Sequence, residues 1–188
     1  MIRPARRLRT DSSTAGPAGP AAGAYTTIEL VTVIVIIAIL AVVASPTLSS
    51  INDTRAAMAA RLLLKDLTFA RQRAVATGTT TWVVFDTNAE SWSILGEDPA
   101  SPGRSGATVL TDPVSGDDDT RVVDTGSFAG VQLISAAVDG DVEVGFDWLG
   151  RPFNASETAI ASAGVITLTG NHVVNVAVST GHITYTAP

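Results

Sequence analysis

The sequence contains no cysteine, few aromatic residues and few charged residues, and its composition excludes several kinds of site and global disorder. Among its 188 residues, aromatic residues make up 5% and charged residues 16%, while hydrophobic residues make up 46%. Without cysteine the chain cannot form disulfides, thiolate metal sites or a cysteine nucleophile. The high apolar content excludes global disorder, and the length suits one domain with an appendage.

Motifs for catalysis and cofactor binding are absent as well. The sequence has no G-x-S-x-G elbow, phosphate-binding loop or dinucleotide-binding pattern, so we expect neither an enzyme nor a cofactor. His172 and His182 lack the spacing of zinc ligands and are interpreted as surface or packing residues. Three aspartates at 117–119, in the acidic loop 112–119, lack the spacing of a calcium loop, so a solvated loop is favoured and calcium binding stays the alternative. We expect no metal site.

Charge is distributed unevenly along the chain. The net charge of −6 argues against a general nucleic-acid binder. Residues 1–24 carry four arginines and one acid, a net charge of +3, and residues 25–188 carry eight bases and seventeen acids, a net charge of −9. Residues 1–24 are otherwise rich in Ala, Gly, Pro and Ser without an apolar period, so we interpret them as a leader that is cleaved off.

A long apolar run follows this leader. Residues Ile28–Ala44 contain only two polar side chains, Glu29 and Thr32. As a helix, residues 25–45 would extend over about 31 Å, which suffices for a hydrocarbon core of about 30 Å. A buried helix of a soluble protein is the alternative, but such a helix should show a polar face, which this run lacks. We therefore predict that residues 25–45 form a transmembrane helix.

The small residues before the apolar run indicate where the leader ends. An ordinary signal peptide has its small-residue cleavage site after the apolar run, whereas Gly23 and Ala24 precede it. Cleavage after Ala24 would create an amino group on Tyr25, and a helix places that residue on the same face as Glu29. Because a carboxylate in a membrane helix is costly, we predict that Glu29 neutralises the amine of its own chain or of a neighbour. The alternative is a carboxylate stabilised by nearby water or by the helix N-terminus.

Residues 23–46 resemble the class III signal of type IV pilins and type II secretion pseudopilins. The shared pattern consists of a small residue, the aromatic Tyr25, a Glu at the fifth mature position, an apolar run and Pro46. One departure is Ala24, because the family usually has Gly before the cleaved bond. The resemblance implies cleavage by a prepilin peptidase, N-methylation of Tyr25, and packing of the apolar helix with other pilins or pseudopilins in a fibre.

After Pro46 the sequence becomes amphipathic. Pro46 should kink the helix, because it lacks an N–H and clashes with the preceding turn. Apolar residues then recur every three or four positions until Gly78, a natural helix end. This stripe comprises Ala56, Ala60, Leu63, Leu67, Ala70 and Ala74. We predict one kinked helix over residues 25–77. The amphipathic segment 46–78, which includes the helix end at Gly78, is the predicted spine of a globular domain.

Part of this stripe resembles the GspH/FimT branch of the same family. Proteins of this branch tend to carry Leu-x-x-Ala-Arg-x-x-Ala here, and Leu67, Ala70, Arg71 and Ala74 fit this signature. An ordinary amphipathic helix explains the Leu and Ala residues but not the Arg in particular. Some pilus relatives of this branch take up DNA through a basic Gly-Arg-x-Arg hairpin, and the matching residues 181–184 lack both arginines. We therefore do not expect a nucleic-acid partner.

The rest of the chain, residues 79–188, is predicted to be rich in β-strands. Short runs of β-branched and aromatic residues alternate with turns that contain Gly, Asn or Asp. They predict strands at 79–86, 91–95, 121–124, 131–134, 142–146, 165–169, 173–178 and 182–186, with a turn at 87–90 and a long loop at 96–120. This order predicts an α+β fold. The resemblance implies a helix packed on antiparallel sheets, and residues 146–150 resemble a Phe-x-x-x-Gly segment of the branch.

These observations predict a minor pseudopilin, a structural subunit of a type II secretion pseudopilus. The chain would cross the bacterial inner membrane once, with residues 79–188 in the periplasm, before it joins a periplasmic fibre. The implied partners are the prepilin peptidase, the inner membrane and other pilin-like subunits. Two alternatives stay open: a minor pilin of a type IV pilus with an adhesion or DNA-uptake role, and a signal-anchored enzyme or sensor.

Overall fold

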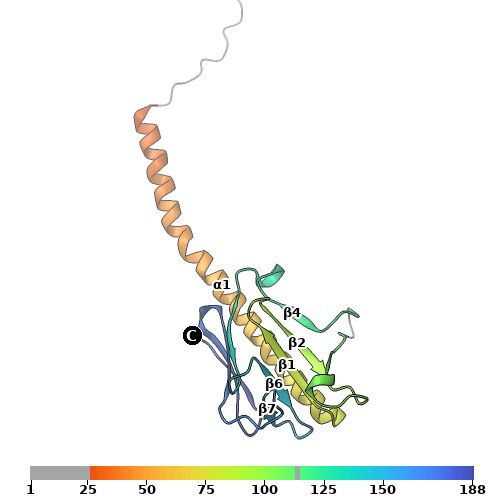
Figure 1. The fold of residues 1–188 in the computed structure, drawn as a ribbon. Coiled ribbons are helices and arrows are strands. Elements are labelled where there is room, and N and C mark those ends of the chain that lie inside the picture. Colours follow the sequence, from red (N-terminus) through yellow and green to blue (C-terminus); the bar gives the residue numbers. More distant parts are fainter. Residues whose placement is uncertain (1–25, 113–114) are drawn as a thin grey trace, which may run out of the picture. The chain divides into compact units, whose positions relative to one another are not determined.

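The structure, a computed structural model, describes residues 26–112 and 115–188, without the side chains of residues 42–50. The chain divides between Val43 and Ala44 into two units. One helix, α1, runs from Thr27 to Thr77 (Figure 1). Gly78 ends the helix at φ +70° and donates a hydrogen bond to the carbonyl of Ala74 at 3.0 Å. The long helix and its end at Thr77 are confirmed.

The described part of the first unit is the beginning of α1. The hydroxyl oxygen of Thr26 accepts a hydrogen bond from the backbone N–H of Glu29 at 3.3 Å, which caps the helix. The hydroxyl of Thr32 donates to the carbonyl of Ile28 at 2.7 Å, so this polar side chain is satisfied within the helix. Ten large apolar side chains between Ile28 and Leu40 are exposed. In the described parts of the chain, no helix has the length and apolarity that a membrane crossing requires.

The described residues after α1 form two antiparallel sheets (Figure 1). In the first sheet the strand order is β3 (Thr108–Val109), β2 (Ser91–Gly96), β1 (Thr81–Asp86), β6 (Glu143–Phe146) and β7 (Pro152–Phe153), and β4 (Thr120–Val122) also pairs with β2. In the second sheet the order is β10 (Ile183–Thr186), β9 (His172–Val176), β8 (Gly164–Leu168) and β5 (Leu133–Ala137). Short 3-10 helices lie at η1 (Arg104–Gly106), η2 (Gly126–Phe128) and η3 (Thr169–Asn171).

The predicted α+β plan is confirmed, and each predicted strand has a counterpart shifted by at most a few residues. The hairpin around residues 87–90 is present as the β1–β2 connection. Two strands were missed, β3 and β7, and each is only two residues long. The predicted long loop 96–120 therefore also contains β3 and η1. Pro152 has no backbone N–H and cannot donate a hydrogen bond to a neighbouring strand, so β7 suits the edge of its sheet.

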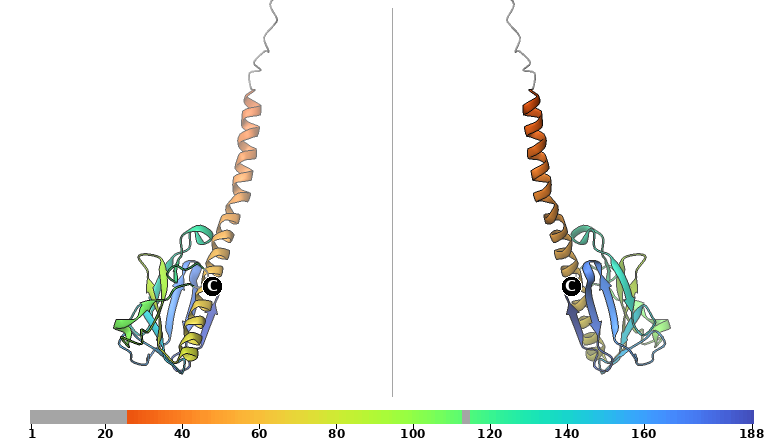
Figure 2. Two further views of the ribbon diagram at one scale, coloured as in Figure 1. Left: turned by 90° about the vertical axis from the view of Figure 1, so that its right-hand side faces the viewer. Right: turned by 90° about the vertical axis from the view of Figure 1, so that its left-hand side faces the viewer.

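The core lies between the second half of α1 and both sheets. All six residues of the predicted apolar stripe are fully buried, and so is Ala59. The strands contribute buried side chains that face the helix, among them Val83, Trp92, Ile166 and Val174. Figure 2 shows this half of the helix lying along the C-terminal strands, drawn in blue. The many alanines of the stripe allow the strands to approach the helix closely. A smaller apolar cluster of Trp82, Leu95 and Phe153 covers the opposite face of the first sheet.

Candidate functional site

The signature residues of α1 lie where the helix meets the two sheets. Leu67, Ala70 and Ala74 are fully buried in the core. Arg71 lies at the edge of this stripe, and its Nε donates a hydrogen bond to the carbonyl oxygen of Gly150 at 3.0 Å. The arginine therefore has a defined contact with the β6–β7 turn, which an ordinary amphipathic helix would not require. Hydrogen bonds from a charged donor are among the stronger ones in proteins.

Two glycines make room for the Arg71 side chain. Gly150 adopts φ +74°, and a Cβ atom there would lie 2.9 Å from Arg71 Nε. Gly181, in the β9–β10 turn, adopts φ +60°, and a Cβ atom there would lie 2.4 Å from the Gly150 carbonyl oxygen and 3.3 Å from Arg71 Nε. Both positions combine a left-handed backbone with a close approach that only glycine allows. Arg71, Gly150 and Gly181 thus join α1 to one turn from each sheet.

Asp147 shapes the turn that presents Gly150. Its Oδ1 accepts hydrogen bonds from the backbone N–H groups of Leu149 and Arg151 at 2.9 and 2.8 Å, and its Oδ2 pairs with the Arg151 guanidinium at 2.7 Å. Partial burial alone would raise the pKa of Asp147, but the hydrogen bonds from Arg151 and Leu149 outweigh it and hold the pKa below its ordinary value. The ionised carboxylate therefore stabilises the turn that accepts the Arg71 hydrogen bond.

A second junction forms around Asp66, a buried carboxylate on α1. Its Oδ2 accepts a hydrogen bond from Trp92 Nε1 of β2 at 2.9 Å and lies 3.8 Å from Arg121 Nε. Arg121 also pairs with Asp119 at 2.9 Å and with Asp112 at 3.3 Å. Burial raises the pKa of Asp66, although the Trp92 hydrogen bond and the Arg121 charge act in the opposite direction. This network attaches the ends of the acidic loop to the helix.

The acidic loop differs in part from the expectation of a solvated segment. Asp117 and Asp118 are exposed as expected, but Asp119 is buried and faces Arg121. The expectation was wrong for Asp119, because the Arg121 cation offsets the cost of burying its carboxylate. The three aspartates therefore do not form one cluster. In the ranges that the structure describes, no group of three or more His, Asp or Glu side chains is placed to hold a metal ion.

The two histidines have different environments. His172 is a packing residue: its Nδ1 lies 2.6 Å from the Tyr185 hydroxyl, and its Nε2 lies 3.0 Å from Asp53 Oδ1. These contacts join β9 and β10 to α1. His182 is exposed beside Gly181. Both positions agree with the interpretation of the histidines as surface or packing residues.

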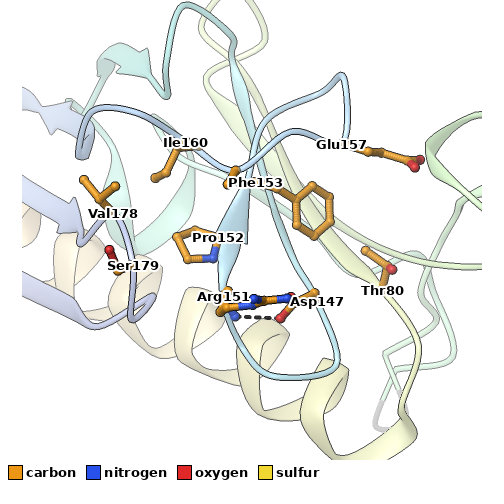
Figure 3. Close-up of a pocket in the computed structure, with 10 residues that line it drawn as sticks. Thr80, Asp147, Arg151, Pro152, Phe153, Glu157, Ile160, Val178 and Ser179 are labelled. Carbon is orange, nitrogen blue, oxygen red and sulfur yellow. Dashed lines mark hydrogen bonds and ion pairs between the residues drawn. The ribbon is translucent and has the colours of Figure 1, made fainter.

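A cavity of about 490 Å³ opens between the two sheets (Figure 3). Pro152, Phe153, Ile160 and Val178 form its apolar side. Thr80, the Asp147–Arg151 ion pair and Glu157 form its polar side, as the sticks in Figure 3 show. Its volume is in the range of small ligand pockets. No local sequence pattern predicts this cavity, because its walls come from four separate segments.

The remaining predicted site residues belong to the N-terminal segment. Ala24 and Tyr25 lie outside the described residues, and so does the Pro46 side chain, so the cleavage site and the kink stay predictions. Residues 42–45 of the predicted membrane span have no described side chains either. Glu29 is exposed, and its carboxylate has no partner among the described residues.

The sequence matches one family model. The family described as Type II transport protein GspH matches residues 59–182, which include the signature on α1 and both turns that contact Arg71. The chain belongs to the GspH family. No match to the sequence was found among curated proteins.

The fold is similar to that of solved pilin-like proteins. Two structures of the minor pseudopilin EpsH from the type II secretion system of Vibrio cholerae match with TM-scores of 0.52 and 0.54 at 11% identity. They cover 71% and 72% of this chain and 96% and 98% of theirs. The type IV minor pilin FimU of Pseudomonas aeruginosa matches with a TM-score of 0.44 at 15% identity, over 71% of this chain and 89% of FimU. The GspH family match and the EpsH-like fold confirm the predicted resemblance to pilin-like subunits.

Proposed function

We propose that this GspH family member is a minor pseudopilin that acts as a structural subunit of a type II secretion pseudopilus. The family match over residues 59–182 is the main support. It coincides with the part of the chain in which Arg71, Gly150 and Gly181 join the helix to both sheets. The function is assembly rather than catalysis: the sheets hold a rigid body on a helix whose beginning packs with other subunits.

The proposed route to the fibre begins with processing at the inner membrane. A prepilin peptidase removes the leader, residues 1–24, by cutting between Ala24 and Tyr25, and the new N-terminus is methylated. Residues 25–45 anchor the chain in the inner membrane and later enter the fibre core, residues 46–78 form the spine, and residues 79–188 fold in the periplasm. The exposed apolar side chains between Ile28 and Leu40 support this part of the proposal, because such a surface requires lipid or neighbouring helices.

Glu29 has a proposed role in setting the position of the subunit along the fibre. Its carboxylate is exposed in a stretch of helix whose other side chains, apart from Thr32, are apolar, and the helix cap uses its backbone N–H rather than its side chain. An unpaired charge among packed apolar helices is costly. Pairing with the N-terminal amine of a neighbouring subunit removes that cost at one register only, so it favours that register over others.

A type IV pilus is the alternative destination, with a role in adhesion or DNA uptake. The resemblance of residues 23–46 applies equally to type IV pilins. The missing arginines at 181–184 disfavour DNA uptake. Neighbouring genes for a secretion ATPase, a secretin and a set of pseudopilins would support the secretion system, whereas genes for a retraction ATPase or for competence would support the pilus.

Deletion of the gene tests the proposal. We expect the deletion to abolish export of the secreted proteins into the medium, with twitching motility unchanged and with export restored by the full chain. Loss of motility or DNA uptake with normal export would instead support the type IV pilus. Normal export, motility and DNA uptake in the deletion strain would contradict both.

A further inference from the structure

The positive and negative charges of residues 51–188 are separated between the helix and the sheets. Residues 51–77 of α1 carry five bases and two acids, whereas residues 79–188 carry three bases and fourteen acids. The three bases of the second group are all in ion pairs: Arg104 with Glu143, Arg121 with Asp119, and Arg151 with Asp147. None of the five helix bases forms an ion pair with a residue that the structure describes. The unpaired charges of the two parts are therefore of opposite sign.

Two of the five unpaired helix bases, Arg61 and Lys65, are exposed on one face of α1. The face of the helix that points away from the sheets carries exposed side chains at spacings of three and four residues. We call it the outward face; it comprises Met58, Arg61, Lys65, Phe69 and Gln72. Met58 and Phe69 are 44% and 42% exposed, so the outward face combines two cations with apolar surface. It contains no acidic side chain.

The cavity between the two sheets has complementary properties. Its apolar side, formed by residues such as Phe153 and Ile160, can accommodate an aromatic side chain. Its polar side includes the exposed carboxylate of Glu157, whose Oε1 accepts a hydrogen bond from the backbone N–H of Arg104 at 2.6 Å but which has no cationic partner among the described residues, and the Arg151 cation is already paired with Asp147. Figure 3 shows the Glu157 side chain extending beyond the ring of Phe153 at this side. A ligand with an apolar group next to a positive charge therefore fits the cavity.

We propose that the outward face of α1 docks at this cavity on a second copy of the chain. Phe69 enters the apolar side, and Arg61 and Lys65 face Glu157 at the polar side. The charge complementarity between the two surfaces of this chain identifies the second copy as the occupant. The contact joins two different surfaces of the chain. A row of docked copies therefore has a free outward face at one end and a free cavity at the other, so it can extend and does not close as a dimer. This inference rests on the proposed function, since it specifies one contact within the fibre.

Cysteine cross-linking in the full chain tests this contact directly, because the chain contains no cysteine of its own. Gln72→Cys lies one turn beyond Phe69 on the outward face, and Ser179→Cys lines the cavity; both positions are exposed. The two variants carry different tags and are expressed together, so that a disulfide with both tags can form only between copies. The control pairs Gln72→Cys with Ser127→Cys, an exposed serine of η2 that does not line the cavity.

We expect at least about tenfold more doubly tagged dimer from the cavity pair than from the control pair. Glu157→Lys in the Ser179→Cys chain should reduce this dimer severalfold, and Lys65→Glu in the Gln72→Cys chain should restore much of it, because the exchange recreates an opposite-charge pair. Resistance of each variant to limited proteolysis shows that it is folded. Equal cross-linking of both pairs, no dimer, or no response to the charge exchange overturns the proposed docking.

Leader cleavage and recovery of the chain in sheared fibres are measured in the same cells. A chain that is cleaved and incorporated but yields no dimer from the cavity pair contradicts only the docking proposal. A chain that is neither cleaved nor incorporated contradicts the proposed function, and the cross-linking result still decides whether the two surfaces meet.

Discussion

Arg71 Nε and the carbonyl oxygen of Gly150 are 3.0 Å apart, and this hydrogen bond joins α1 to the turn between β6 and β7. The turn between β9 and β10 packs on the same two groups through Gly181. One helix residue therefore positions a turn from each sheet. This junction fixes the second half of α1 against the sheets, as a rigid subunit requires.

Loss of the Arg71 side chain should destabilise the protein. Arg71→Ala removes a hydrogen bond from a charged donor and part of the packing between the two turns, and we expect a loss of about 1.5–3 kcal/mol in the free energy of unfolding. All three tryptophans lie in residues 79–188, so tryptophan fluorescence during denaturant unfolding reports on this part of the chain. Arg61→Ala is the matched control, because Arg61 is exposed on the same helix, and its loss should cost less than about 0.5 kcal/mol. Equal effects of the two substitutions would contradict the role of Arg71.

The close approach at Gly181 predicts a steric effect that can be separated from backbone strain. Gly181→Ala places a methyl group 2.4 Å from the Gly150 carbonyl oxygen, whereas a Cβ atom at Gly140 would have no neighbour within 4 Å. Both glycines have positive φ, so both alanine variants carry a similar backbone penalty of about 1–2 kcal/mol. We expect Gly181→Ala to lower the free energy of unfolding by at least about 1 kcal/mol more than Gly140→Ala. Equal losses would show that the turns are free to move apart.

The raised pKa of Asp66 predicts a specific pH dependence of stability. Because burial favours the protonated carboxyl, the folded protein binds this proton more tightly than the unfolded chain, and stability is lost as the pH rises from the ordinary value of 3.8 towards the raised pKa. Asp66→Asn removes this titration. The free energy of unfolding of the wild type, minus that of the variant, should therefore fall across this interval and be constant above it.

Asp147→Asn provides the control of opposite sign. Its pKa is lowered, so its stabilising effect is present above the ordinary value of 3.8 and is lost as the pH falls towards the lowered pKa. The same difference, wild type minus Asp147→Asn, should rise with pH up to the ordinary value of 3.8, whereas that for Asp66→Asn falls above 3.8. Slopes of the same sign would contradict the environments described for the two carboxylates.

Glu29→Ala should separate membrane insertion from fibre assembly. The substitution leaves the apolar run intact, so we expect normal recovery of the chain in the inner membrane fraction. Without the carboxylate the neighbouring amine has no partner, and incorporation into sheared fibres should fall severalfold. Glu29→Asp keeps the charge and should retain more incorporation. Unchanged incorporation of Glu29→Ala would contradict the proposed pairing.

Periodicity in the sequence was sufficient to predict the elements with long apolar patterns. The stripe from Ala56 to Ala74 predicted the buried face of α1, since spacings of three and four residues define one side of a helix. The strands that contribute to the core were predicted for the same reason. Strands β3 and β7 were missed, because two residues are too few for a period and Pro152 argues against a strand.

Contacts between distant segments could not be predicted from local patterns. The sequence indicated the signature with Arg71, the segment that ends at Gly150 and the turn at Gly181, but not that these three residues meet. The burial of two polar residues, in contrast, can be inferred from their positions in the apolar pattern. Asp66 falls on the apolar stripe between Leu63 and Ala70, and His172 is in phase with the buried residues of β9.

The N-terminal residue of the mature protein tests the central proposal most directly. Mass spectrometry of the chain purified from its native membrane, with and without the prepilin peptidase gene, determines that residue. We predict a chain that begins with an N-methylated Tyr25 when the peptidase is present, and the uncleaved leader when it is absent. A mature chain that keeps Met1, or one cut beyond residue 45 and released from the membrane, would contradict the account of a processed fibre subunit.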